Sequence, residues 1–73
     1  MYILSLFFGK VETDYQIKDI DIKDDEMKKF LFSLGCFQGE DIKIISKISE
    51  NLIIKIKDAR YSIDKELAGA ILI

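Results

Sequence analysis

The spacing of apolar residues along the chain predicts one helix among several short strands. The helix is expected at residues 24–34, where four apolar side chains recur at the spacing of a single helical face. They are Met27, Phe30, Leu31 and Leu34. An aspartate at the start, Asp24 or Asp25, can accept hydrogen bonds from the free amides of the first turn. Gly35 can adopt the left-handed conformation that ends the last turn.

Short strands are expected on both sides of this helix, because β-branched and aromatic residues alternate there with polar ones. The strands are predicted at residues 2–8, 15–22, 41–48, 52–57, 60–63 and 70–73. The apolar parity changes between Ile17 and Ile20, which predicts a bend near residues 18–19. It changes again at Ile45, which predicts a bulge or a strong twist in the third strand.

The predicted connections are short and polar. Turns are expected at Glu50-Asn51 and at Asp58-Ala59. Asp64 is predicted to cap a short helical turn that runs to Ala68 and that Gly69 ends. Short strands joined by tight turns favour a small closed or nearly closed antiparallel barrel, which covers its own edges. The predicted fold is therefore mostly β with one inserted helix, in a single domain of residues 1–73.

Composition limits the chemistry open to this chain. Its 73 residues include no His, no Trp, no Pro and one Cys, which excludes His-based catalysis, multi-Cys metal sites and an internal disulfide. The net charge of −2 argues against a dedicated nucleic-acid binder, which carries a clustered excess of Lys and Arg. Mean hydropathy is +0.13, and no apolar stretch approaches the ~18 residues of a membrane span. Cys36 alone suits a reducing cytosol, so a cytoplasmic location is expected, and an enzyme is the least favoured class.

One segment of nine residues carries a resemblance to a known family. It consists of Leu34, Gly35, Cys36, Phe37, Gln38, Gly39, Glu40, Asp41 and Ile42. This segment resembles the ferrous iron transport protein A (FeoA) family, in which a helix ends in Leu-Gly, three residues follow, and a second Gly opens a strand of alternating Ile or Val. The likeness covers residues 15–73. It implies the fold of that family, a small SH3-like antiparallel β-barrel.

The resemblance implies a cytoplasmic accessory protein of ferrous iron uptake, whose partner is the GTP-binding region of the membrane transporter FeoB. An aromatic side chain on a short rigid loop suits an anchor for such a partner. The predicted partner-binding residues are Leu34, Gly35, Cys36, Phe37, Gln38 and Gly39, with the side chains of the middle three displayed at the tip of the loop. No cofactor, nucleic-acid partner or direct membrane insertion is expected, and the oligomeric state is left open.

Two alternative functions stay open from sequence. One is a direct Fe²⁺ sensor or chaperone, which would hold the metal weakly through Cys36 and carboxylates. The other is a generic SH3-like interaction module. The acidic run at residues 19–26 lacks the spacing of an EF-hand, so helix capping and solvated charge explain it better and no metal site is predicted. Gly35 and Gly39 also have a purely structural explanation as positions of positive φ.

Two further groups of side chains have an expected place. Lys43, Lys47, Lys55 and Lys57 are expected on the outer face of two neighbouring strands, as solvated residues that discourage edge pairing. Phe7, Phe8 and Phe30 are expected in the core. Phe32 lies off the apolar face of the predicted helix, so it either packs under the N-terminal strand or is exposed as a contact.

Overall fold

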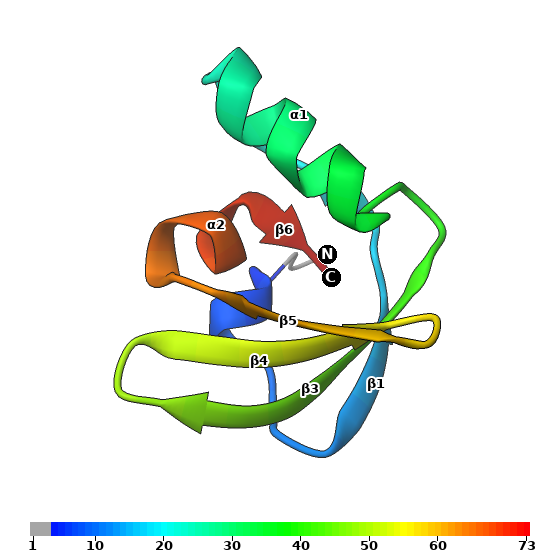
Figure 1. The fold of residues 1–73 in the computed structure, drawn as a ribbon, viewed down its shortest axis with the longest axis vertical. Helices are drawn as coiled ribbons and strands as arrows, with labels where there is room; N and C mark the ends of the chain where they lie inside the picture. Colours follow the sequence, from blue (N-terminus) through cyan, green and yellow to red (C-terminus); the bar gives the residue numbers. More distant parts are fainter. Residues whose placement is uncertain (1–3) are drawn as a thin grey trace.

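The structure is a computed structural model that describes residues 4–73. Its strands are β1 (Thr13–Gln16), β2 (Asp19–Ile20), β3 (Asp41–Ile48), β4 (Asn51–Ile56), β5 (Ala59–Ile63) and β6 (Ile71–Leu72). Its helices are the 3-10 helix η1 (Leu6–Phe8) and the α-helices α1 (Asp25–Leu34) and α2 (Lys65–Ala70). An antiparallel sheet has the order β1-β3-β4-β5, and β2 pairs with β6 in a second one. Figure 1 shows α2, η1 and β6 on one side of the larger sheet, with α1 farther out. The predicted mostly β fold with an inserted helix is confirmed.

The core is built chiefly from isoleucine. The buried isoleucines are Ile17, Ile20, Ile42, Ile44, Ile54, Ile56, Ile63, Ile71 and Ile73. Alternate residues of β3 and β4 supply several of them, since successive side chains of a strand point to opposite faces. Burial of each such side chain contributes about 1.5–3 kcal/mol. Within residues 4–73 no charged side chain is buried, so hydrophobic burial, and not ion pairing, holds the barrel together.

The predicted bulge in β3 is confirmed at Ile45. The pairing with β4 runs in register up to Ile44, and after the bulge Lys47 lies opposite Leu52. Leu52 is buried, so the bulge transfers Lys47 to the inner side of the sheet. There its Nζ lies 3.9 Å from the centroid of the Phe7 ring. The expectation that Lys47 shares the outer face with Lys43 is therefore wrong.

The N-terminal segment differs from the predicted strand at residues 2–8. Residues 2–3 lie outside the described part, and Leu6–Phe8 forms the 3-10 helix η1. Backbone hydrogen bonds within this turn hold it: Phe8 N donates to Ser5 O at 3.1 Å, and Gly9 N donates to Leu6 O at 2.9 Å. It directs Leu6 into the core and leaves Phe8 69% exposed, so the expectation of a buried Phe8 is wrong.

The predicted bend near residues 18–19 is confirmed as a change of sheet. The chain leaves β1 after Gln16 and enters β2 at Asp19, where it pairs with β6. Between them Lys18 N donates to Leu72 O at 2.7 Å. Ile17 and Ile20 are both buried although their parity differs, because the chain changes direction between them: Ile17 follows β1, and Ile20 lies in β2.

Helix α1 begins and ends where the sequence predicts. Oδ1 of Asp24 accepts from the backbone N–H of Glu26 and of Met27, at 2.9 and 3.2 Å, and Gly35 closes the helix with φ 98°. Leu31 is fully buried, whereas Phe30 is 46% exposed. The expectation of a core Phe30 is wrong, because α1 projects from the barrel and contacts it mainly through its C-terminal half (Figure 1).

Helix α2 and the two hairpin turns differ slightly from expectation. The cap is confirmed, since Oδ1 of Asp64 accepts from Leu67 N at 2.9 Å. Gly69 does not end α2; it lies inside the helix, which continues to Ala70 and passes directly into β6. Both turns come one residue earlier than predicted, and their positive φ angles fall on Ser49 and Lys57. No helix within residues 4–73 has the length and apolar character needed to cross a bilayer.

Candidate functional site

Loop 35–39, which joins α1 to β3, is fastened to the barrel by its backbone. Cys36 N donates to Leu31 O at 3.1 Å, which ties the loop to the end of α1. Gly39 N donates to Ile17 O at 2.7 Å, which ties the other end to the segment between β1 and β2. Gly35 and Gly39 both have positive φ, at 98° and 91°, a conformation that other residues adopt at a cost. The loop is therefore a rigid support for the side chains that it carries.

Cys36 does not lie at the tip of this loop as expected. Its side chain is fully buried in the core. Burial raises the pKa of the thiol from 9.0 to about 11, so the thiol stays protonated at neutral pH. Since metals bind the thiolate, this position opposes the use of Cys36 as a ligand. Elsewhere in residues 4–73, no three or more His, Cys, Asp or Glu side chains are grouped as they would be around a metal ion.

Phe37 is displayed, and it does not stand alone. Its ring is 47% exposed and stacks on the ring of Phe32, with centroids 5.3 Å apart and planes 14° from parallel. Phe32 is itself half-buried, since it packs against the core and also lines the surface beside Phe37. Nζ of Lys28 lies 5.9 Å from the centroid of the Phe32 ring. Lys28 thus lies beside one ring of the pair, that of Phe32, and the other ring, that of Phe37, is partly exposed to solvent.

A groove of about 370 Å³ runs beside the aromatic pair. It is lined by Asp19, Ile20, Lys28, Phe32, Phe37 and Gln38. Three elements meet here, namely β2, α1 and loop 35–39, and this groove is called the aromatic groove below. Its apolar wall and its two opposite charges suit a segment of another protein better than a small polar molecule. The Asp19 carboxylate is oriented by the Ile20 N–H, which donates to Oδ1 at 2.8 Å.

Two of the six predicted site residues, Phe37 and Gln38, line the aromatic groove. The other four, Leu34, Gly35, Cys36 and Gly39, do not line it. The predicted set of partner-binding residues did not include Lys28 and Phe32 of α1, or Asp19 and Ile20 of β2, which line the groove as well. Phe32 was considered only as a contact by itself, and its pairing with Phe37 was not predicted. The sequence feature that could have indicated this pairing is the spacing of the two aromatic residues: Phe32 comes five residues before Phe37, and the helix-ending Gly35 lies between them.

Solved structures share the whole fold. A crystal structure of the iron uptake regulatory protein FeoA has a TM-score of 0.86 and 21% identity, and covers 97% of this chain and 95% of that one. FeoA of Stenotrophomonas maltophilia, complexed with zinc, has a TM-score of 0.83 and 18% identity, and covers 93% and 86%. It is described as a prokaryotic SH3 domain protein and a candidate activating factor of bacterial ferrous iron transport. A manganese-dependent transcriptional repressor also matches, with a TM-score of 0.88 and 15% identity over 97% of this chain, which spans 40% of the repressor.

These identities are low enough that the structures establish the fold alone, and the SH3-like architecture is confirmed. Comparison with curated protein sequences gives no match. The model of the FeoA domain family, in contrast, matches residues 5–73. That match includes the helix, the loop with its two glycines and all six strands. The chain belongs to the FeoA domain family.

Proposed function

We propose that this chain is a cytoplasmic accessory protein of ferrous iron uptake, and that it binds the GTP-binding region of a FeoB-type membrane transporter through the aromatic groove. Membership of the FeoA family supports the process. The stacked pair of Phe32 and Phe37, held by a hydrogen-bonded loop, is the observation that carries the proposed contact. The protein acts by binding and not by catalysis.

The aromatic groove has the physical properties of a protein anchor. Phe37 exposes about half of its surface, and its ring stacks on that of Phe32, which favours one orientation. A preorganised aromatic loses little conformational entropy on binding, so more of the contact energy contributes to affinity. Lys28 and Asp19 flank the apolar wall and select a segment of complementary charge. By binding one conformation of the transporter region more tightly than another, the protein shifts the equilibrium between them.

The first prediction concerns Phe37. Phe37→Ala removes the open half of the aromatic pair and is expected to weaken binding to the GTP-binding region by about tenfold or more, as for a buried aromatic anchor. The measurement is an NMR titration of the isotope-labelled protein with the soluble GTP-binding region of the cognate transporter. Shifts are expected along loop 35–39, β2 and the last turns of α1.

The matched control is Phe30→Ala. Phe30 has nearly the same exposure as Phe37, 46% against 47%, and belongs to α1, but it does not line the aromatic groove. Its replacement is expected to leave affinity unchanged. Equal losses in the two variants would remove the aromatic groove from the contact. A titration with no shifts at high concentration of the transporter region would contradict the proposed partner itself.

A further inference from the structure

Basic residues form a row across the outer face of the larger sheet. In the strand register Lys43 of β3 lies directly opposite Lys55 of β4, and Lys55 lies directly opposite Arg60 of β5. Asp14 of β1 lies opposite Lys43 and ends the row. The neighbouring row toward the hairpin side contains the buried Ile44 and Ile54, so the charged row faces away from the core. Three cations therefore lie side by side on adjacent strands.

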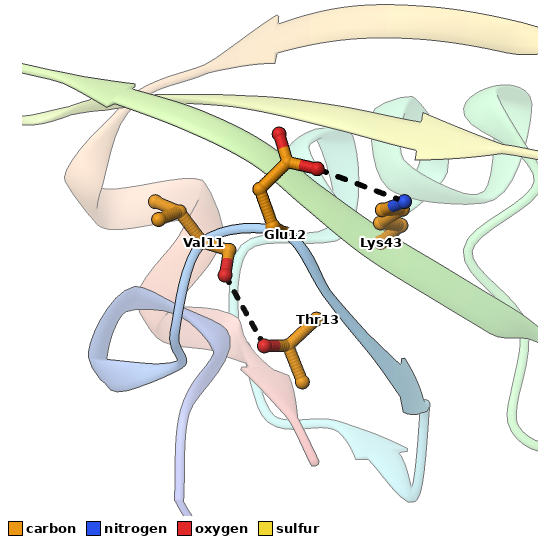
Figure 2. Close-up of polar contacts among 4 residues, drawn as sticks. All are labelled: Val11, Glu12, Thr13 and Lys43. Carbon is orange, nitrogen blue, oxygen red and sulfur yellow. Dashed lines mark hydrogen bonds and ion pairs between the residues drawn. The ribbon is translucent and has the colours of Figure 1, made fainter.

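This arrangement is unfavourable for the free protein, because like charges directly opposite each other destabilise an antiparallel pair. Protection against edge pairing does not explain it, contrary to the sequence-based interpretation, because β3 and β4 are the interior strands of the sheet. Acidic side chains within the described residues offset this repulsion only weakly. Oε2 of Glu12 lies 3.9 Å from Nζ of Lys43, and the Lys43 side chain is 34% exposed against 70% for Glu12 (Figure 2). Residues 4–73 contain no ion pair to Lys55 or Arg60.

The row borders a hollow of about 360 Å³, which is called the basic hollow below. It is lined by Asp14, Asp41, Ile42, Lys43, Lys55 and Lys57. None of these residues lines the aromatic groove, so the two sites are separate. Lys57, in the turn that follows β4, adds a further cation, because it also lines the hollow. A concentration of positive charge on an acidic protein calls for an anionic occupant.

We propose that the basic hollow binds the oligophosphate chain of a small ligand such as a nucleoside triphosphate. Neighbouring strands lie about 4.8 Å apart, so the backbone positions of Lys43 in β3 and of Arg60 in β5, at the border of the hollow, are about 10 Å apart across the sheet. A single phosphate reaches at most two neighbouring cations, whereas a chain of phosphates follows the row. Ammonium and guanidinium groups are the usual partners of phosphate oxygens.

The two carboxylates of the hollow favour a small ligand over an extended anionic surface. Asp14 and Asp41 line the hollow together with the lysines, and their charges repel a flat anionic surface such as a membrane. A compact ligand avoids this repulsion by placing its phosphates toward Lys55 and its hydroxyl groups toward the carboxylates, which accept hydrogen bonds. The mixed lining thus favours a small phosphorylated molecule over an extended polyanion.

The test compares phosphate, pyrophosphate, tripolyphosphate and ATP as probes of the intact chain, by NMR and isothermal titration. Affinity is expected to rise along the phosphate series and to fall with added salt, with shifts at the amides of β3, β4 and β5. Lys55→Gln is expected to weaken tripolyphosphate binding about tenfold, as for loss of one charged hydrogen-bond donor. Lys55→Arg is expected to retain binding, and the exposed Lys29→Gln on α1 serves as the control.

A second readout separates a binding role from a structural one. Lys55→Gln relieves the like-charge contacts, so the ligand-free variant is expected to unfold at a higher temperature than the parent although it binds less tightly. Affinity that does not depend on phosphate chain length would overturn the proposal, as would equal weakening by Lys29→Gln. Binding of anionic vesicles or of a poly-glutamate peptide without binding of tripolyphosphate would also overturn it, in favour of a membrane or a protein ligand.

Discussion

At the scale of single residues, replacing glycine by alanine is expected to change the free energy of unfolding in opposite directions at two positions. A Cβ on Gly9 would lie 2.7 Å from Cδ1 of Ile44 and 3.2 Å from the carbonyl oxygen of Leu6. Ile44 is fully buried and has little room to move. Gly9→Ala is therefore expected to lower the free energy of unfolding by about 1–3 kcal/mol, the cost of overpacking a core.

Gly69 provides the matched comparison. It is an exposed residue inside α2 without positive φ, and a Cβ added to it would meet no atom within 4 Å. Gly69→Ala is expected to raise the free energy of unfolding by about 0.4–1 kcal/mol, because it restricts the unfolded chain and favours the helix. Denaturant unfolding of the two variants checks both signs. An unchanged free energy of unfolding in Gly9→Ala would contradict the first expectation and would show that Ile44 repacks without cost.

The candidate site was partly predictable at this scale. Gly35 and Gly39 bracket a short loop by local backbone chemistry, so a displayed Phe37 follows from the sequence. The stacking of Phe37 on Phe32 does not, because it depends on how the loop folds back beside α1. The burial of Cys36 was missed for the same reason, since the side of the loop that faces the core depends on backbone bonds to Leu31 and to Ile17, between β1 and β2.

At the scale of elements, the two helix caps are chemically alike but support different structures. Asp24 caps α1, whose first turns project from the barrel, and Asp64 caps α2, which buries Ala68 and Ala70 in the core. Loss of either cap costs its helix about 0.5–2 kcal/mol. Asp64→Ala is expected to lower global stability by this amount. Asp24→Ala is expected to fray the first turn of α1 with little change in the global unfolding midpoint.

Amide hydrogen exchange combined with denaturant unfolding distinguishes these outcomes. Faster exchange confined to the first two turns of α1 in Asp24→Ala, with an unchanged midpoint, is the expected pattern. An equal shift of the midpoint in both variants would contradict it and would mean that the whole of α1 belongs to the cooperative unit. Because Lys28 lies in this part of α1, the same variant measures how much the aromatic groove depends on helix order.

Elements that depend on neighbouring residues, such as caps and apolar parity, were predictable from the sequence. Elements that depend on contacts between remote segments were not. The ends of α1 follow from Asp24 and Gly35, and the bulge at Ile45 follows from parity. The 3-10 helix η1 stands where a strand was predicted, and its one buried residue, Leu6, packs in a core built from segments remote in sequence. Helix α2 continues past Gly69 to Ala70 and leads directly into β6, whose partner β2 is remote in sequence.

At the scale of the whole molecule, the barrel encloses one titratable group among the described residues, the Cys36 thiol. Its pKa is raised by burial from 9.0 to about 11. Between these two values the unfolded chain loses the thiol proton while the folded protein keeps it. The folded state then binds more protons than the unfolded state, so stability falls as the pH rises through this window and does not change for this reason below pH 9.

The last prediction follows from that linkage. Over the window from pH 9.0 to about 11, the thiol is expected to lower the free energy of unfolding by up to about 2–3 kcal/mol. Cys36→Ala costs stability at every pH through the volume that it removes, but it is expected to abolish this part of the alkaline slope. The measurement is denaturant unfolding of both proteins from neutral pH to about pH 11, and the difference between their curves isolates the thiol from every other titrating group. Parallel curves would mean that the thiol reaches solvent in the folded protein, and would reopen Cys36 as a thiolate ligand for a metal.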